Sequence, residues 1–572
     1  MSYVKYLQFD VDRCLNRIKR TINLLIKDKN LMMTSLDAQR CPERNMFSTV
    51  EESNYCNQES EVSEFFSGRK ILITGGSGFL GRLILEKLLR SCPKIDRIYL
   101  LMRGKKQKDM QTRFKEYFND IIFERLKGEQ KDVEKKIVLI ESDMRELNLG
   151  MSEKDRERIK DTEVIFHCAA SVRFNDTLRF IINVNVRGTR DLLLLAREMP
   201  NLKAFTYVST AFSQCIYERI EEKCYNPPLK TDDIIKLTEI LNEDQLNFIT
   251  PELLGKWPNT YTYSKAISED TVRQYSRGFP TCIVRPSSVL ATEKDPIAGW
   301  INNLYGFTGV VLGIGLGIIR VFNLDRTLVH DIIPADYVVN NIIVSTWDTA
   351  KKRSISPVIT NFDKDDKSLT VDAEEIPVYN VVSYVQNPMI WNYCILKLLE
   401  IASITPFRKC LWYPFFLSLT NEYFFYLCII LFHWIPGFIV DSLALLVGRK
   451  PRLLNIYRKV HKVTKVMKFF VTHQWEYTND NVLKLWNKLS VVDKNKFFFN
   501  ISDLDWDSYL LTYCKGIRVF LLNDPLETVN DAKILYKRLR IIHYTTGIVL
   551  LILLLWGLYL LLQFLYTFLF SF

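Results

Sequence analysis

The stretch from Ile71 to Leu89, ILITGGSGFLGRLILEKLL, places a cluster of glycines between a run of β-branched residues and an amphipathic segment. Gly75, Gly78 and Gly81 form G-x-x-G-x-x-G at the junction of an expected strand and an expected helix. Glycine permits a tight turn, lets the backbone approach a pyrophosphate and lets the helix pack closely on the strand. The start of the helix then offers free N–H groups to the anion. The junction therefore predicts a dinucleotide-binding unit.

Further apolar runs follow this junction at the spacing of strands that are separated by helices. Counting the first, the runs are 70–75, 97–103, 136–143, 163–170, 204–210 and 281–287. They are apolar without alternation, as strands covered on both faces should be. This rhythm predicts an α/β fold with a doubly wound parallel sheet of the Rossmann type.

The remaining sequence divides by composition into regions with different expected structures. Residues 1–61 are polar and weakly periodic, which predicts a disordered extension. Residues 62–384 should form the Rossmann domain with substrate-binding insertions. Residues 385–530 are rich in aromatic side chains and predict a mainly α-helical C-terminal domain. The chain should therefore fold as two joined domains behind a polar extension.

One stretch of the expected helical domain is very apolar. Phe424 to Val440 is interrupted by His433 and Pro436 and is short for a membrane span. We expect a buried or membrane-lying segment here rather than a crossing. The basic run that follows could contact anionic lipid or an anionic ligand, or could be a solvated helix face.

Residues 546–572 are almost wholly apolar and predict a transmembrane helix at the C-terminus. They are long enough for a hydrocarbon core of about 30 Å. Cationic residues precede them and no charge follows, so the positive-inside rule predicts a single-pass protein whose catalytic part faces the cytosol. Such an anchor suits both the endoplasmic reticulum and the peroxisome, and we expect the former. The alternative is a buried helix of a soluble domain.

Charge and cysteine usage restrict the partners. The formal net charge of +11 favours phosphate-bearing cofactors or an anionic membrane. No recognisable motif supports binding to nucleic acid. The 12 cysteines and 6 histidines are scattered without CxxC or HExxH spacing, which predicts neither a disulfide framework nor a metal site. Nothing in the sequence indicates an oligomeric state.

The end of the second expected strand indicates which dinucleotide binds. NAD-binding proteins usually place an acid there for the ribose hydroxyls. This chain has Arg103, Lys105 and Lys106 at that place, and cations suit the 2′-phosphate of NADPH. The alternative is a solvated basic turn. The predicted cofactor contacts also include Asp143 beside the adenine and the segment from Cys168 along the cofactor. The full set is Thr74, Gly75, Gly76, Ser77, Gly78, Phe79, Leu80, Gly81, Arg103, Asp143, Met144, Ala169, Ala170, Ser171 and Lys265.

The motif YTYSK supplies the predicted catalytic pair. Tyr261 and Lys265 are four residues apart and share one face of a helix. We expect the ammonium to lower the phenol pKa, which makes proton exchange possible near neutral pH. Thr210, or its neighbour Ser209, should bond the substrate oxygen. The alternative is a chance YxxxK on a surface helix.

The order of glycine loop, VST, YxxxK and IVRPSSV resembles the extended short-chain dehydrogenase/reductase superfamily. A closer resemblance is to the fatty acyl-CoA reductases. The opening VSEFFSGRKILITGGSGFLGRLILEKLLRSCP, the helix WPNTYTYSKAISE and the C-terminal FHWIPGFIVDSLALLVGRKPRLLNIYRKVHK are similar to that family. The likeness covers roughly Val62 to Asp524. The family usually has a lysine at the place of Leu316 and a proline near Phe307, positions that border the expected acyl-CoA region.

The resemblance implies a two-step reduction of long-chain fatty acyl-CoA by NADPH. Tyr261, supported by Thr210 and Lys265, would stabilise and protonate the oxyanion, CoA would leave, and the aldehyde would be reduced to the primary alcohol. Its implied partners are the acyl-CoA substrate and membrane lipid. Two alternatives stay open: another membrane-bound reductase or dehydrogenase of the superfamily, acting on sterols, other lipids or nucleotide sugars, and a cofactor-binding scaffold without catalysis.

Overall fold

The computed structural model describes residues 59–104, 109–353 and 375–570. The extension predicted for residues 1–61 therefore lies almost wholly outside the described residues. The same is true of the predicted cations Lys105 and Lys106. From Glu59 onward the chain forms one compact unit.

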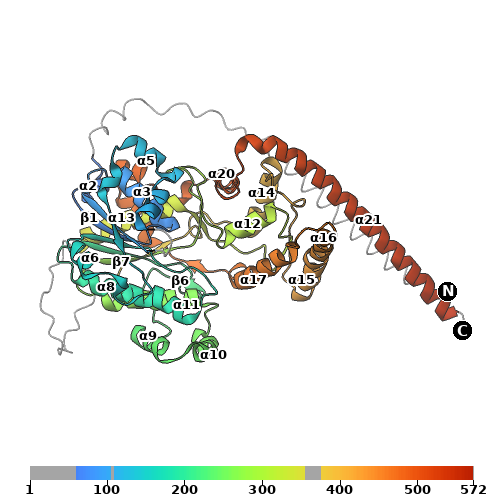
Figure 1. Ribbon diagram of the computed structural model, residues 1–572, viewed down its shortest axis with the longest axis horizontal. Coiled ribbons are helices and arrows are strands. Elements are labelled where there is room, and N and C mark those ends of the chain that lie inside the picture. Colours follow the sequence, from blue (N-terminus) through green and yellow to red (C-terminus); the bar gives the residue numbers. More distant parts are fainter. Residues whose placement is uncertain (1–58, 105–108, 354–374, 571–572) are drawn as a thin grey trace. The chain divides into compact units, whose positions relative to one another are not determined.

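A seven-stranded parallel sheet, in the order β11-β7-β5-β4-β1-β2-β3, forms the centre of the α/β region (Figure 1). Six of its strands are those predicted from the apolar runs, and the α/β fold is confirmed. The seventh, β11, was missed because it is a four-residue run beyond the end of the strand–helix rhythm. The strands are β1 (Lys70–Thr74), β2 (Arg97–Met102), β3 (Ile137–Glu141), β4 (Val164–His167), β5 (Ala204–Val208), β7 (Thr281–Pro286) and β11 (Val378–Val381).

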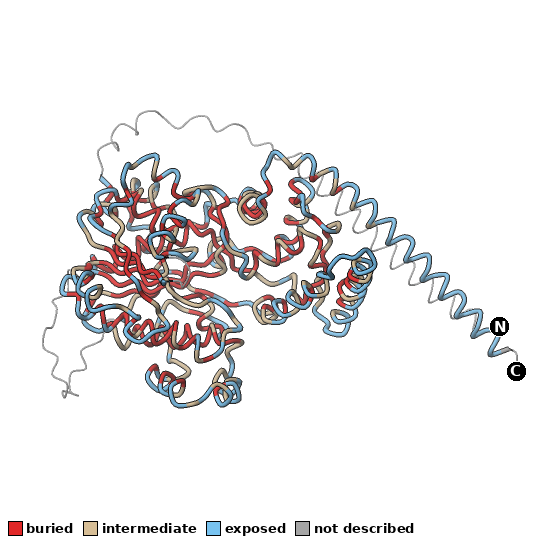
Figure 2. Tube along the Cα trace, in the orientation of Figure 1, coloured by how far each residue is buried: buried red, intermediate tan, exposed pale blue. Residues whose placement is uncertain are grey.

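Helices cover both faces of this sheet, as the unbroken apolar strands require. Ile71 and Ile73 of β1 point into one core with α3 (Phe79–Ser91) and α13 (Ala335–Arg353). Leu72 points the opposite way, into a second core with α8 (Gly188–Arg197) and α11 (Thr260–Tyr275). Figure 2 shows the sheet buried between these layers. The carboxyl ends of the strands are thereby left as the place where a ligand can bind.

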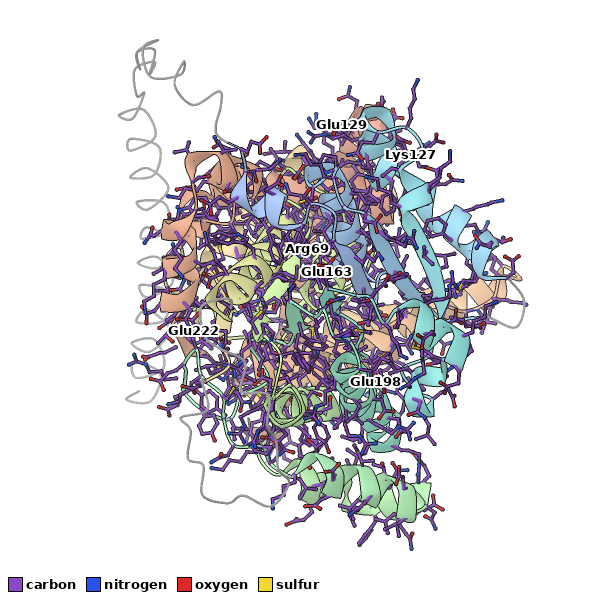
Figure 3. The ribbon with its side chains drawn as sticks, turned by 90° about the vertical axis from the view of Figure 1, so that its left-hand side faces the viewer. Arg69, Lys127, Glu129, Glu163, Glu198 and Glu222 are labelled. Atoms are coloured by element: carbon purple, nitrogen blue, oxygen red, sulfur yellow. The ribbon has the colours of Figure 1, made fainter. Side chains whose placement is uncertain are left out.

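A salt bridge fixes the two strands beneath the glycine turn at their starting ends. The Arg69 guanidinium lies 2.6 Å from the carboxylate of Glu163 (Figure 3). The second oxygen of Glu163 accepts the backbone N–H of Lys70 at 3.2 Å. The contact joins the residues just before β1 and β4, which are hydrogen-bonded neighbours. Both strands are thus held in register where the glycine turn follows.

The C-terminal region is mainly helical, as predicted, but it does not pack as a separate body. Two-residue parallel strands join it to the first region: β12 (Leu417–Ser418) pairs with β9 (Val321–Phe322), and β13 (Glu476–Tyr477) pairs with β6 (Arg219–Ile220). One hydrophobic core contains residues of both regions. The larger helices here are α14 (Trp391–Ile404), α15 (Glu422–Ile429), α16 (Ile435–Leu446), α17 (Leu453–Val471), α18 (Asp480–Lys488), α20 (Trp506–Gly516) and α21 (Val529–Phe570).

Shorter elements complete the fold. They are α2 (Glu61–Phe65), α4 (Met110–Phe118), α5 (Glu124–Glu129), α6 (Glu153–Arg158), α7 (Leu178–Ile181), α9 (Thr231–Ile240), α10 (Glu243–Leu254), α12 (Phe307–Gly315), α19 (Val491–Lys496), β8 (Ser288–Leu290) and β10 (Ile332–Pro334).

Among the described residues, two helical segments are long and apolar enough, by length and composition, to cross a membrane. They are Glu422–Leu446, whose most apolar 18-residue window has a mean hydropathy of 1.9, and Leu526–Leu569, whose most apolar window has a mean hydropathy of 2.7. None of the most apolar window of the second is buried, which is contrary to the alternative of a buried helix for residues 546–572. Helix α21 begins at Val529, so the polar residues before the predicted span belong to the same continuous helix.

Candidate active site

The glycine turn after β1 has the shape that a bound pyrophosphate needs. Gly75 has a φ of +67°, and the N–H of Gly78 donates to its carbonyl at 2.8 Å. A Cβ on Gly75 would lie 2.6 Å from the backbone nitrogen of Ala169, and one on Gly81 would lie 2.3 Å from the Gly75 carbonyl oxygen. Gly78 begins α3 without a side-chain cap and is exposed together with Ser77. The turn and the helix start therefore fit the diphosphate of a dinucleotide.

Three of the predicted cofactor contacts have their side chains turned away from this turn. The Thr74 hydroxyl is buried, lies 2.7 Å from Nδ1 of His167 and accepts the N–H of Ala169 at 3.2 Å. The side chains of Phe79 and Leu80 pack on the core. Phe79 and Leu80 can therefore reach a cofactor through their backbone N–H groups, whereas Thr74 shapes the site from behind.

Tyr117 of α4 supports the glycine turn by a contact that we did not predict. Its hydroxyl donates to the carbonyl of Gly76 at 2.9 Å. The guanidinium of Arg82 lies 4.6 Å from the centre of the same ring. The contact joins residues that are far apart in the chain, so no local pattern could have found it.

The ends of β2 and β3 meet at the predicted adenosine side of the site. Arg103 is exposed, and its charge helps to lower the pKa of Asp143. Burial alone would raise that pKa, but the hydrogen bond from Arg145 outweighs it; Arg145 Nε lies 3.0 Å from Asp143 Oδ1. Met144 is half-buried beside Asp143. The carboxylate of Glu141 lies beside Gly104 on the same edge. The edge thus carries two exposed arginines and two carboxylates.

The loop after β4 is joined to the catalytic helix through Asn185. Asn185 Oδ1 accepts the N–H of Ser171 at 2.8 Å, while Nδ2 donates to the Ser171 carbonyl at 3.1 Å and to Ser264 Oγ at 2.9 Å. Asn185 lies in a π-helical turn, Ile182–Arg187, a feature that often marks functional sites. Ala169, Ala170 and Ser171 are half-buried along this loop. The available signal was a pair of asparagines, Asn183 and Asn185, in an otherwise apolar run, and we did not predict a role for either.

Tyr261 lies in the first turn of α11, where the side chain of Asn259 caps the helix by accepting the N–H of Thr262 at 2.9 Å. Burial raises the pKa of Tyr261 to about 12, and a hydrogen bond with Thr210 opposes part of that rise. The expectation of a lowered phenol pKa was therefore wrong for this state of the protein. Burial dominates, and the side chain that interacts with the phenol is Thr210.

Lys265 faces the carboxyl end of β5. Its ammonium donates to the Val208 carbonyl at 2.8 Å and to the Tyr207 hydroxyl at 3.2 Å. Burial lowers the pKa of Lys265 to about 8, although the charge of Glu269 acts in the opposite direction. The ammonium of Lys265 can therefore lose its proton within a pH unit or so of neutrality.

Ser209 and Thr210 have different partners, although they are neighbours. Ser209 Oγ donates to Glu269 Oε1 at 2.6 Å. Glu269 is fully buried against Arg285, with 2.7 Å between Oε2 and a guanidinium nitrogen. Ser209 therefore belongs to a buried ion-pair network, and Thr210 is the hydroxyl beside Tyr261. Glu269 follows Lys265 by one further helical turn, a spacing that the sequence analysis overlooked.

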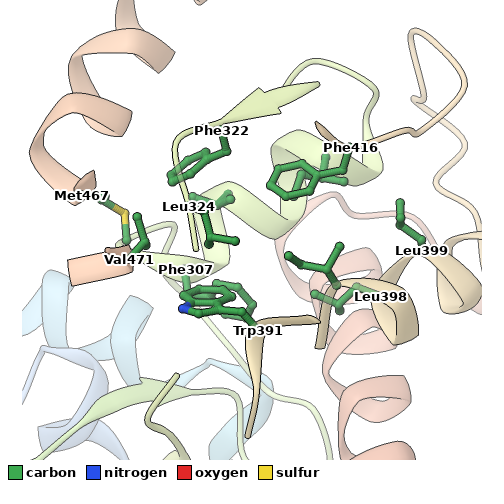
Figure 4. Close-up of a pocket in the computed structure, with 12 residues that line it drawn as sticks. Phe307, Phe322, Leu324, Trp391, Leu398, Leu399, Phe416, Met467 and Val471 are labelled. Atoms are coloured by element: carbon green, nitrogen blue, oxygen red, sulfur yellow. The ribbon is translucent and has the colours of Figure 1, made fainter. Parts of the chain in front are cut away.

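A cavity has Tyr261 on its wall. Most of its lining is aromatic, from segments around residues 174, 212, 307, 330 and 470–477. A second, smaller cavity has an apolar lining that includes Trp391, Leu398 and Phe416 (Figure 4). The two cavities share Phe307, Met467 and Val471. Phe307, near which we expected a departure from the family pattern, lies where the cavities meet.

Two polar atoms in the wall of the larger cavity have no hydrogen-bond partner within the described residues. They are His330 Nδ1 and the Tyr477 hydroxyl, and both side chains are buried. Burial lowers the pKa of His330 to about 3, so its imidazole is neutral. Within the same described ranges, no cluster of three or more His, Cys, Asp or Glu side chains could hold a metal ion.

Comparison with known proteins agrees with this geometry. A family model described as male sterility protein matches residues 73–342, and a second model with the same description matches residues 432–524. Fatty acyl-CoA reductase wat of Drosophila melanogaster is 36% identical over 506 residues, which is 88% of this chain and 94% of that protein. Fatty acyl-CoA reductase 1 of Mus musculus is 35% identical over 493 residues, 86% of this chain and 92% of that protein.

Among solved structures, the reductase domain of a nonribosomal peptide synthetase from Mycobacterium tuberculosis has a similar fold. The TM-score is 0.51 at 18% identity, over 79% of this chain and 92% of that one. This likeness supports the fold, whereas the sequence matches extend through both regions of the chain. The chain therefore belongs to the fatty acyl-CoA reductase family.

Proposed function

We propose that this chain reduces a long-chain fatty acyl-CoA to a primary fatty alcohol, with NADPH as the reductant and with release of CoA. The observation that carries the proposal is Tyr261, whose pKa Thr210 helps to lower, on the wall of a cavity that adjoins a wholly apolar one. A phenol at this place can donate a proton to the carbonyl oxygen of a lipid whose tail lies in the apolar cavity. The names of the relatives support the same substrate class.

The glycine turn and the start of α3 would hold the diphosphate of the cofactor. Arg103, exposed at the end of β2, favours NADPH because a guanidinium pairs well with a 2′-phosphate. When bound, the cofactor supplies hydride. Tyr261 would donate its proton to the oxygen on which charge develops, Thr210 would hold that oxygen and the phenol together, and Lys265 would supply positive charge nearby.

The chemistry balances as two reductions. In the first, the thioester carbon gains a hydride, its oxygen is transiently protonated, the C–S bond breaks, and CoA leaves as the thiol with an aldehyde as the other product. In the second, the aldehyde carbon gains a hydride and its oxygen gains a proton. His330 Nδ1 and the Tyr477 hydroxyl, both without partners in the described structure, would then hydrogen-bond polar groups of a substrate in this cavity.

Purified full-length protein in lipid nanodiscs tests the proposal. With a long-chain acyl-CoA we expect two NADPH oxidised for each free thiol formed and a fatty alcohol on gas chromatography, with NADH a poorer reductant. Tyr261→Phe should lower turnover by about 10²–10⁴-fold while NADPH affinity and melting temperature stay unchanged. Turnover near that of the wild type in this variant would contradict the role of Tyr261. One NADPH per thiol, with aldehyde accumulating, would contradict the alcohol product.

We also propose that α21 anchors the protein in the endoplasmic reticulum with the catalytic region in the cytosol. The cations before the apolar part of the helix support that orientation. Protease added to sealed microsomes should digest the catalytic region, and a glycosylation site appended after Phe572 should be modified. Imaging with endoplasmic reticulum and peroxisome markers separates the two organelles.

A further inference from the structure

We propose that a second element, the helical hairpin of residues 422–471, inserts in the plane of an anionic phospholipid bilayer. Its apolar arm is the continuous helix 422–446, and its basic arm is α17. The two arms join at residues 447–452, which we call the tip. This surface is separate from the apolar span of α21 and does not depend on the proposed reaction.

The apolar arm is attached to the protein by a narrow stripe only. Ile429, His433, Gly437 and Asp441 recur every four residues and are buried. His433 Nε2 accepts the N–H of Arg320 at 3.1 Å, which fixes the arm to the segment before β9. The other faces of the arm carry large exposed apolar side chains: Tyr423, Phe424, Leu427, Ile430, Leu431, Ile435, Phe438, Ile439, Leu443 and Leu446. So large an apolar face on one helix needs a partner.

The charges of the hairpin identify that partner. Residues 421–468 contain eight Lys or Arg and two Asp or Glu. One of the acids, Asp441, accepts three backbone N–H groups at the start of α17, and the other, Glu422, pairs with Lys468. The remaining cations are exposed and have no carboxylate partner within the described residues: Arg449, Lys450, Arg452, Arg458, Lys459, Lys462 and Lys465. An apolar face bordered by unpaired cations matches a bilayer with anionic headgroups.

The same charges favour insertion in the plane over a crossing. Asp441 binds the start of α17, and Gly437 lies against Leu454 and Tyr457, so the two arms are held together as one unit. A crossing of the apolar arm would draw the basic arm, with its exposed cations, into the hydrocarbon, where charged side chains are expensive. Lying in the interface lets the apolar arm enter the acyl layer while the cations of α17 remain at the phosphates.

Photocrosslinking of full-length protein in nanodiscs tests the inference. A photoreactive amino acid replaces Phe438, which is 66% exposed on the hairpin, or Phe248, which is 85% exposed on α10 and serves as the matched control. We expect lipid adducts at position 438 at least about tenfold above those at position 248, because the hairpin lies in lipid and α10 does not. Equal yields at both positions, or none at 438, would overturn the proposal.

Two further experiments test whether the hairpin needs anionic lipid and how deeply it enters the bilayer. Removing phosphatidylserine from the nanodiscs, or introducing Arg449→Glu with Lys450→Glu, should lower the crosslinking at position 438 several-fold while the melting temperature and anchoring through α21 are kept. An unchanged yield in both would contradict recognition of anionic lipid.

Gly448→Asn with Lys450→Ser creates a glycosylation site at the tip, and the positive φ of Gly448, +70°, tolerates Asn. Its glycosylation in microsomes, where a site appended after Phe572 is modified, would show a crossing and overturn the in-plane hairpin.

Discussion

The proposed cofactor end and the proposed acyl end of the site are built in different ways. At the cofactor end, one continuous turn from Thr74 to Gly81 sets the shape, and its backbone rather than its side chains faces the ligand. At the acyl end, the cavity walls come from segments spread between Phe174 and Tyr477, and aromatic side chains form the surface. The first end depends on a backbone that leaves no room for a Cβ, and the second depends on volume. A single substitution should therefore abolish binding at the cofactor end, whereas substitutions at the acyl end should change activity by degrees.

The largest effect is expected from Gly75→Ala. The added Cβ would meet the backbone of Ala169 at 2.6 Å, and backbone cannot move aside as a side chain can. We expect loss of measurable NADPH binding by calorimetry. Gly68→Ala is the matched control because Gly68 has the same φ of +67° with nothing within 4 Å. It should cost about 1–2 kcal/mol of stability and leave binding intact; equal loss of binding in both variants would point to backbone strain alone.

The next effect separates the two neighbouring hydroxyls. Thr210→Val removes the group that bonds Tyr261, so we expect kcat to fall by about 10²–10³-fold. Ser209→Ala removes a donor to the buried Glu269, which should lower the free energy of unfolding by about 1.5–3 kcal/mol and change kcat only slightly. Steady-state kinetics and chemical denaturation of both variants provide the measurements. A reversed pattern would make Ser209 the catalytic hydroxyl.

A smaller effect concerns pH. The pKa of Lys265 is lowered to about 8, so the ammonium loses its charge as the pH rises through that value. Tyr261 keeps its proton, since its pKa is about 12. The reduction rate should therefore decline above about pH 8, with a limiting slope of tenfold per pH unit. Lys265→Arg, checked for an unchanged melting temperature, should remove the decline because guanidinium does not titrate there; a decline that persists would assign it to another group.

The smallest effect is expected where the two cavities meet. Phe307→Leu should widen the passage between them and raise the ratio of kcat/KM for longer over shorter acyl chains by about tenfold, since contacts of one or two methylenes are worth that much. Leucine keeps part of the contact with Trp391 and so protects the fold. Phe248→Leu, on the exposed surface of α10, is the control. An unchanged ratio would mean that the acyl chain does not pass Phe307.

The sequence predicted the local parts of this arrangement well. Six strands follow from unbroken apolar runs, and Tyr261 and Lys265 fall on one face of a helix because of their spacing. The strand β11 gave too short a signal. Which of Ser209 and Thr210 faces the site depends on how the chain leaves β5, and adjacent side chains there point in different directions. The spacing of residues in the sequence therefore could not show which of the two hydroxyls faces the site.

Contacts between distant segments were beyond such reasoning. Tyr117 meets Gly76 only after α4 has packed across the turn. The pKa of Tyr261 was expected to be low because Lys265 is nearby in sequence, but the ammonium is held by Val208 and Tyr207 and burial decides the direction. The acyl cavity needs residues from both regions, so its shape is a tertiary property.

Helix α17 connects two places that otherwise have nothing in common. It starts at the cationic tip and ends at Val471, and Met467 and Val471 on its last turns form part of the boundary between the two cavities. With the hairpin in the bilayer as proposed, a shift of α17 at the membrane surface would move Met467 and Val471 at the boundary of the two cavities. We therefore expect turnover measured in detergent to differ from turnover on a bilayer.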